Sequence, residues 1–258
     1  MPDGPEMAER TTLLLLHGGL GFDHSHLKSA HSKLADMAQL VYVDHRDNGR
    51  SNRISPGRWN PDQWADDLKA LCAVLEIERP IALGVSFGGV VAQAFALRHP
   101  GTSAKLILSS TAGAMRLDRA YDMFERLGGA KARETAERYW SDPTQPGALD
   151  PYLEVCFPLY NPSPYDSNMV ERSVMHRDML THFFGPDGEG HRFDFLPDLG
   201  KVRCPTLVLA SALDPITPVV DSEDLAAALP ADLVRHKLFE GWGHRVDQDN
   251  LERDFIAS

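Results

Sequence analysis

Short apolar runs that alternate with segments of helical periodicity constrain the fold of this 258-residue chain more than any other feature. A short apolar run bounded by polar or turn-forming residues is typical of a strand that is buried on both faces. Such strands, separated by helices, form a mainly parallel sheet with helices on both sides. We therefore predict a doubly wound α/β domain. The runs lie at 12–16, 40–44, 81–85, 106–109, 206–210 and 234–239.

Two of the intervening helices have clear sequence boundaries. Asn60 followed by Pro61 is typical of a helix start, and the apolar residues after it recur at helical spacing. The second helix runs from Phe87 to His99, is rich in glycine and alanine at its start, and ends before the sequence Pro-Gly. We expect both helices to pack on the sheet.

Residues 113–200 do not follow the strand-helix pattern. They contain several proline- and glycine-rich stretches and a concentration of aromatic residues, including Trp140 and Phe183. Long connections in compact proteins are usually functional or carry their own structure. We expect a helical cap at 113–200, inserted into a core of residues 1–112 and 201–258. Its aromatic residues either fill the interior of the cap or line a substrate pocket.

The pattern G-V-S-F-G, from Gly84 to Gly88, places Ser86 directly after a predicted strand and before a predicted helix. Glycines two residues before and after the serine remove Cβ atoms that would collide in a tight strand-to-helix turn, and the turn exposes the hydroxyl. The alternative is a serine that only caps the helix. The apolar strand before it and the small residues after it favour a nucleophile.

A serine hydroxyl needs a general base, and the base needs an acid that holds it in one tautomer. On α/β folds of this kind the acid and then the histidine follow later strands. Asp214 follows the run 206–210, and His244 follows the run 234–239. We predict a catalytic triad of Ser86, Asp214 and His244. Three other acidic residues near the same strands lack the position at a strand end: Asp198, Asp221 and Asp247.

An acyl-transfer site also needs two backbone N–H groups for the developing oxyanion. We expect one from Phe87 and the other from the loop H-G-G-L-G at 17–21, where glycine lets the backbone approach a ligand closely. Gly19 is the predicted donor, with Leu20 as the alternative. The side chains predicted to contact the substrate are Leu20, Trp140 and Phe183.

The motifs H-G-G-L-G, D-H-R-D-N-G-R-S (44–51), G-V-S-F-G-G and G-W-G-H resemble those of the α/β-hydrolase superfamily, most closely its proline iminopeptidase-like branch. The resemblance implies an α/β-hydrolase fold with a cap, and a serine hydrolase that cleaves an ester or amide bond. In that branch the loops resemble H-G-G-P-G and D-Q-R-G-x-G-R-S, so Leu20, His45 and Asp47 are departures. Because the branch also includes esterases and lactonases, both remain alternatives to an aminopeptidase.

The class of substrate depends on the cap. An aminopeptidase needs a cap carboxylate to bind the free α-amino group of its substrate. A non-turnover receptor for a small molecule is the alternative from outside the enzymes. Within the enzymes, a lyase, a dehalogenase or an epoxide hydrolase on the same fold is a further alternative, and the last two generally need an aspartate in place of Ser86. The candidate carboxylates are Glu134, Glu137, Asp150, Glu154, Asp166, Glu171 and Asp178.

The formal net charge of -11 works against binding to nucleic acid and leaves a small molecule as the expected partner. The acidic start of the sequence lacks the basic region of a secretory signal, and no apolar run is long enough to span a membrane, so we expect a cytoplasmic protein. Four histidines within 17–31 match no metal-binding pattern. We expect neither a metal nor a cofactor.

Members of the superfamily usually begin with an antiparallel hairpin before the first parallel strand. Few residues precede Thr11 here, so we expect that hairpin to be shortened or absent. The last helix is also expected to be short. Either feature could leave a sheet edge for a second subunit to cover, which makes the chain a candidate for a homo-oligomer.

Overall fold

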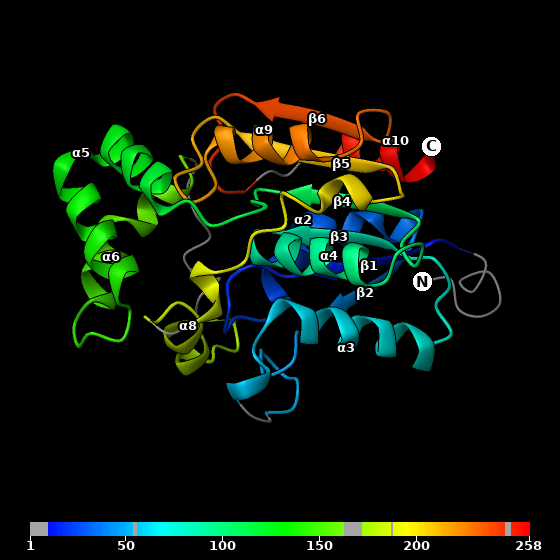
Figure 1. The fold of residues 1–258 in the computed structure, drawn as a ribbon, viewed down its shortest axis with the longest axis horizontal. Coiled ribbons are helices and arrows are strands. Elements are labelled where there is room, and N and C mark those ends of the chain that lie inside the picture. The colour runs from blue at the N-terminus through cyan, green and yellow to red at the C-terminus, as the bar shows by residue number, and fades with distance from the viewer. Residues whose placement is uncertain (1–9, 54–55, 163–171, 187, 246–248) are drawn as a thin grey trace.

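The computed structural model describes residues 10–53, 56–162, 172–186, 188–245 and 249–258, and these form one parallel six-stranded sheet flanked by helices (Figure 1). The strand order is β2-β1-β3-β4-β5-β6. The α/β prediction is confirmed, and each predicted run differs from its strand by no more than one residue at either end. The strands are β1 (Thr12–Leu16), β2 (Gln39–Val43), β3 (Ile81–Val85), β4 (Lys105–Ser109), β5 (Thr206–Ser211) and β6 (Val234–Phe239).

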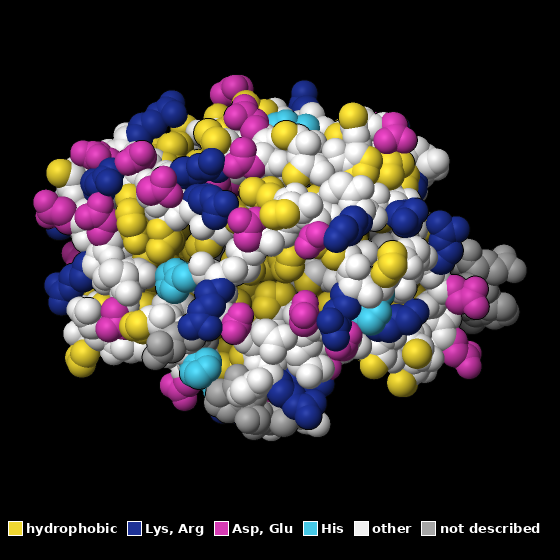
Figure 2. All heavy atoms as spheres, viewed as in Figure 1, with side chains coloured by type: hydrophobic (Ala, Val, Ile, Leu, Met, Phe, Trp, Pro, Cys, Tyr) yellow, Lys and Arg dark blue, Asp and Glu magenta, His cyan; other side chains and the backbone are white. Residues whose placement is uncertain are grey.

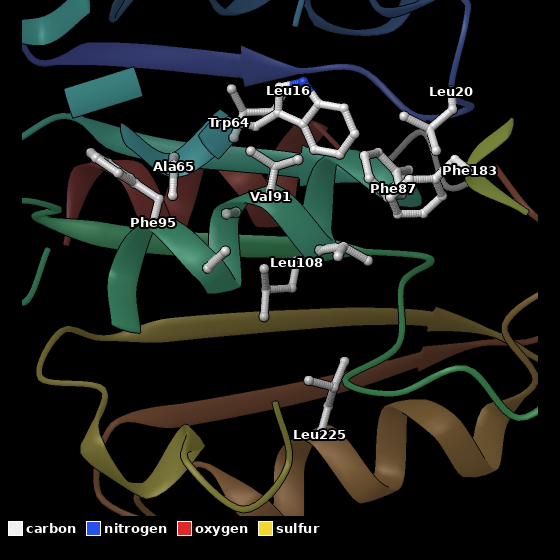
Figure 3. Close-up of a cluster of buried hydrophobic side chains, with 14 of the residues drawn as sticks. Leu16, Leu20, Trp64, Ala65, Phe87, Val91, Phe95, Leu108, Phe183 and Leu225 are labelled. Carbon is white, nitrogen blue, oxygen red and sulfur yellow. The ribbon is translucent and has the colours of Figure 1, made fainter. Parts of the chain in front are cut away.

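Helices cover both faces of the sheet because the central strands are apolar on both faces. In β1, Leu14 and Leu16 belong to one buried cluster, whereas Leu13 and Leu15 belong to another. The first cluster includes side chains of α3 (Pro61–Val74), α4 (Phe87–Arg98) and α9 (Val219–Ala228), and Figure 3 shows part of it. The second includes side chains of α2 (Ser25–His31) and α10 (Asp249–Ala257) on the opposite face.

The two predicted helix boundaries agree with the structure. The Asn60 side chain accepts a hydrogen bond from the Gln63 N–H at 2.8 Å, and Pro61 is the first residue of α3. Proline fits this position because the first helical N–H has no partner within the helix. Helix α4 begins at Phe87 as expected and ends at Arg98, one residue before the predicted end.

The segment between β4 and β5 carries further helices to the side of the sheet (Figure 1). Its two ends lie together, because Ala114 and Asp194 form an antiparallel bridge and the Phe195 N–H donates to the Gly113 carbonyl at 2.8 Å. Pairing at its base is consistent with an inserted cap, although the division at 113 and 200 stays a prediction. The α-helices among the described residues of this segment are α5 (Leu117–Ser141), which is interrupted at Gly129, α6 (Leu149–Val155) and α8 (Arg177–Phe183).

At the amino-terminal end, β1 is the first described strand, and β2 forms one edge of the sheet. The expected loss of the hairpin falls on residues 1–9, which lie outside the described residues. At the other end, α10 is short, as expected.

Strands β1 and β3 and helix α4 meet at the turn between β3 and α4. A Cβ on Gly84 would collide with the backbone of Gly88, and a Cβ on Gly88 would collide with the backbone of Leu16 in β1. The helix can start directly on the sheet only because these side chains are absent. Gly84 and Gly88 are therefore needed for the steric reason that we expected from the sequence.

Replacing Gly84 by alanine tests this close approach. Because the Gly88 backbone cannot move without displacing α4, Gly84→Ala is expected to lower the free energy of unfolding by about 1–3 kcal/mol in urea denaturation. The control is Gly57→Ala, since a Cβ at Gly57 has no atom within 4 Å. Equal stability of the two variants would contradict the steric explanation.

Candidate active site

Ser86 lies between β3 and α4 with backbone angles φ 53° and ψ -120°. Such a backbone conformation is strained for a residue with a Cβ, and it persists only where surrounding contacts enforce it. Here the Ser86 N–H donates to the Ser109 carbonyl at 2.9 Å, and the Ser86 carbonyl accepts from the Gly89 N–H at 2.9 Å. The side chain is thereby held at the carboxyl end of the sheet.

The structure brings all three predicted triad residues together. The His244 Nε2 lies 2.9 Å from the Ser86 Oγ, and its Nδ1 lies 2.9 Å from both carboxylate oxygens of Asp214. An ionised carboxylate only accepts hydrogen bonds, so Nδ1 carries the proton and Nε2 is free to accept the hydroxyl proton. This arrangement can remove the proton of a serine hydroxyl during attack on a carbonyl.

Asp214 is fully buried, and its carboxylate is held by the turn that follows β5. Oδ1 accepts from the Ile216 N–H at 2.8 Å and the Thr217 N–H at 2.9 Å, and Oδ2 accepts from the Thr217 hydroxyl at 2.8 Å. These donors fix the carboxylate orientation and compensate for the loss of water. Sequence reasoning missed Thr217, although a hydroxyl residue three positions after the acid was a usable signal.

The loop that carries His244 is held from two sides. The Leu213 N–H donates to the Trp242 carbonyl at 3.0 Å, which ties the loop to the turn after β5. On the other side, the His244 N–H donates to the Tyr160 carbonyl at 2.6 Å. Sequence reasoning also missed Tyr160, because a contact through a backbone carbonyl leaves no mark on residue type.

The rival acidic residues take other roles. Asp198 pairs with Lys201, and Asp221 is buried and accepts from Arg119 at 2.6 Å. Burial raises the pKa of Asp221 to about 6, since it outweighs the lowering effect of Arg119. Asp247 lies outside the described residues.

The predicted oxyanion loop passes beside the serine. A Cβ on Gly18 would lie 2.8 Å from the Ser86 Cβ, so the loop backbone is in direct contact with the turn between β3 and α4. Gly19 has a φ of 61°, a conformation that suits glycine. Phe87 is the first residue of α4, where backbone N–H groups have no acceptor within the helix. Phe87 therefore directly follows Ser86, and Gly19 follows the residue whose backbone lies beside Ser86.

His17 fixes the orientation of the peptide group between Gly18 and Gly19. The His45 N–H donates to His17 Nε2 at 3.2 Å, so the proton of the neutral ring is on Nδ1, which donates to the Gly18 carbonyl at 3.0 Å. In a trans peptide the carbonyl and the following N–H point in opposite directions. The Gly19 N–H is thereby directed away from His17.

Hydrogen bonds and an ion pair join the loop at 44–51, which carries one of the family-like motifs, to the loop at 17–24. Asp44 accepts from the His24 N–H at 2.8 Å, and the Gly21 N–H donates to the Asn48 side chain at 2.6 Å. Asp23 is fully buried and pairs with Arg50. Burial alone would raise the pKa of Asp23, but hydrogen bonds from Ser25 and Arg50 lower it to about 2.

The side chains predicted to bind substrate are all buried. Leu20, Phe87 and Phe183 converge beside the start of α4 (Figure 3), and the Phe87 and Phe183 rings are 5.2 Å apart in an edge-to-face arrangement. Trp140 and Phe183 both belong to the inserted segment, but the Trp140 indole N–H donates to the Tyr152 hydroxyl at 3.0 Å, inside that segment. Substrate contact by Leu20, Trp140 and Phe183 stays a prediction.

Within the described ranges, no group of three or more His, Cys, Asp or Glu side chains is arranged to hold a metal ion. The three cysteines are buried free thiols, and burial raises the pKa of Cys156 to about 12 and that of Cys204 to about 11. Neither of these two is poised as a thiolate nucleophile. No described helix is both long and apolar enough to cross a membrane.

The chain belongs to the alpha/beta hydrolase fold family, whose sequence profile matches residues 11–246. The proline iminopeptidase PfmaB of Pestalotiopsis fici is 29% identical over 242 residues, which cover 86% of this chain and 81% of that protein. The resemblance to the proline iminopeptidase-like branch is thereby confirmed, and the chain is a hydrolase of the α/β fold.

Solved structures give the same fold. The crystal structure of a proline iminopeptidase from Mycobacterium smegmatis superimposes with a TM-score of 0.74 at 24% identity, covering 96% of this chain and 87% of that one. A thermophilic esterase from Thermogutta terrifontis superimposes with a TM-score of 0.64 at 26% identity, covering 96% and 88%. The solved structures that resemble this chain therefore include both a peptidase and an esterase.

Three histidines near the predicted oxyanion loop, His17, His26 and His45, predict a loss of stability in acid. Burial lowers the pKa of His17 and His26 to about 3 and that of His45 to about 4. These pKa values lie below the value of about 6.5 for a histidine in the unfolded chain. At a pH between the folded and the unfolded pKa, the unfolded state therefore binds protons that the folded state does not bind. The free energy of unfolding is therefore expected to fall as the pH drops from about 6.5 towards about 4.

The variant His45→Gln keeps a side-chain donor for the His17 carbonyl, which accepts from His45 Nε2 at 3.3 Å. It removes one titrating group, so the loss of stability between pH 7 and pH 5 is expected to be smaller by about 1–2 kcal/mol. Urea denaturation at the two pH values measures the difference. An unchanged pH dependence in the variant would show that His45 is not neutral in the fold.

Proposed function

We propose that this protein is a serine hydrolase that cleaves an ester or amide bond of a small molecule through an acyl-enzyme. The observation that carries the proposal is the position of His244, with one ring nitrogen 2.9 Å from the Ser86 hydroxyl and the other 2.9 Å from Asp214. A histidine so placed can act as general base and then as general acid without moving.

In the first half of the reaction, the Ser86 Oγ attacks the substrate carbonyl carbon while its proton passes to His244 Nε2. Asp214 stabilises the resulting imidazolium through the Nδ1 hydrogen bond. The N–H groups of Phe87 and Gly19 are the proposed donors to the oxyanion. The tetrahedral intermediate collapses when His244 protonates the leaving oxygen or nitrogen, and Ser86 keeps the acyl group.

In the second half, water attacks the acyl carbon and gives its proton to His244. The same two N–H groups stabilise the second oxyanion. Collapse of this intermediate breaks the bond to Ser86 Oγ, which recovers its proton from His244. The products are a carboxylic acid and an alcohol or amine, and these steps require no cofactor.

An uncharged acyl group is the substrate feature that the described residues support best. Among the cap carboxylates that could bind an α-amino group, Glu137 pairs with Arg133 at 2.7 Å, and acidic side chains gather on the outer surface of α5 (Figure 2). By contrast, the aromatic side chains of Phe87 and Phe183 lie beside the start of α4, next to Ser86 (Figure 3). The exposed carboxylates are Glu134, Asp150, Glu154 and Asp178, and Asp166 and Glu171 lie outside the described residues.

An aminopeptidase is the second candidate, and the names of the relatives favour it. A panel of p-nitrophenyl esters and proline p-nitroanilide separates the two. Higher kcat/KM on uncharged acyl esters supports an esterase, and higher kcat/KM on the anilide with a free amino group supports an aminopeptidase.

A cytoplasmic location and a homo-oligomer stay predictions.

Labelling with a fluorophosphonate probe tests the nucleophile. We expect the wild-type protein to be labelled at Ser86, and Ser86→Ala to lose both the label and turnover, with kcat reduced by roughly 10⁴-fold or more. Mass spectrometry of the labelled peptide and initial rates on the panel above provide the measurement.

The matched control is Ser103→Ala, since Ser103 is also buried but precedes β4, at the opposite end of the sheet. This variant is expected to keep both the label and the activity. A folded wild-type protein that takes up no label would contradict a nucleophilic Ser86. Labelling without turnover of any substrate in the panel would favour the small-molecule receptor instead.

A further inference from the structure

The His244 loop has a second attachment whose role goes beyond the triad. A short helical turn, Phe157–Tyr160, brings the inserted segment against this loop. The Tyr160 carbonyl accepts from the His244 N–H at 2.6 Å, and the Asn161 side chain accepts from the Arg245 N–H at 3.0 Å. A Cβ on Gly243 would collide with the Tyr160 carbonyl, so the two backbones are in direct contact.

The Tyr160 side chain also contacts the catalytic base. Its ring meets the His244 ring nearly at right angles, with the ring centres 5.5 Å apart. Edge-to-face contacts of this kind have a preferred geometry, so the tyrosine ring restricts rotation of the imidazole. Tyr160 therefore holds His244 both by its backbone and by its ring.

Tyr160 is itself anchored inside the inserted segment. Its hydroxyl lies 2.6 Å from the Tyr152 hydroxyl on α6, which accepts from the Trp140 N–H on α5 at 3.0 Å. Burial raises the pKa of both tyrosines well above the ordinary value, so both hydroxyls keep their protons. The three side chains form one hydrogen-bonded chain from α5 to the residue that contacts His244.

We propose that Tyr160 is a positioning residue for His244, and that its hydroxyl, anchored through Tyr152 to Trp140, couples the inserted segment to the catalytic base. The role rests on the proposed function, since it matters for turnover only if His244 transfers protons. Proton transfer requires the imidazole to stay aligned with both Ser86 and Asp214. A Tyr160 side chain that is not anchored by its hydroxyl therefore lowers the rate of the chemical step.

The variant Tyr160→Phe keeps the ring and the backbone carbonyl and removes only the anchoring hydroxyl. We expect kcat to fall roughly threefold to tenfold, with KM changed less than about twofold. The control is Tyr139→Phe. Tyr139 is buried in the same segment and stacks on Tyr152 with ring centres 4.2 Å apart, but it lies outside the chain of hydroxyls. This control should keep the wild-type kcat.

A second measurement does not depend on turnover. The proton shared between His244 Nδ1 and Asp214 can be followed by ¹H NMR, and its resonance is expected to broaden in Tyr160→Phe and to stay sharp in Tyr139→Phe. Trp140→Phe, which removes the far donor of the chain, should broaden it to a smaller extent. Melting temperatures of all variants separate this effect from a general loss of stability.

Four results would overturn the inference. They are an unchanged kcat in Tyr160→Phe, an equal loss of kcat in Tyr139→Phe, a rise in KM at constant kcat, and an unaltered His244–Asp214 resonance. If Tyr160→Phe does not fold, the comparison of Trp140→Phe with Tyr139→Phe decides the question. Wild-type protein without activity but with the expected NMR differences would contradict the proposed function and leave the positioning role standing.

Discussion

The close approach of glycine backbone to neighbouring elements around Ser86 is the constraint on which the rest of the site depends. Gly84 and Gly88 lie where any Cβ would collide with a neighbouring element, and Ser86 between them takes a strained backbone conformation. Strain of this kind costs about 1–3 kcal/mol, and here the contacts of β1, β3 and β4 with the turn offset it. A strand and a helix that joined less tightly would leave the hydroxyl inside the turn.

The parallel sheet converts this local turn into a site. All neighbouring strands run in the same direction, so the residues that follow β3, β5 and β6 emerge at one edge. Ser86 and His244 are 158 positions apart in the sequence and share a hydrogen bond. The distance between them is set by strand order and not by either loop alone, which is why a sequence pattern is enough to predict that they meet.

The strands and the three residues that meet at this edge could be predicted from the sequence because each has a local signal. Apolar runs indicate the strands, and the residues that flank Ser86 indicate the turn. The surroundings of His244 were not predictable in the same way. Tyr160 contacts it through a backbone carbonyl, which every residue type possesses, and through a ring that only the tertiary structure brings beside the imidazole. Trp140 and Phe183 could have filled an interior or lined a pocket, and only tertiary contacts show that both are buried.

The attachment of the inserted segment to His244 through a backbone carbonyl bears on how such an enzyme could diversify. A carbonyl acceptor survives almost any substitution at its own position, so mutations can alter the inserted helices without breaking this hydrogen bond. Selection could then change which molecules are accepted while the hydrogen bonds of His244 with Ser86 and Asp214 stay in place. This hydrogen bond would be lost if an insertion or deletion shifted the chain near Tyr160 out of register with the loop that carries His244, whereas the ring and hydroxyl contacts of Tyr160 restrict substitution at that position itself.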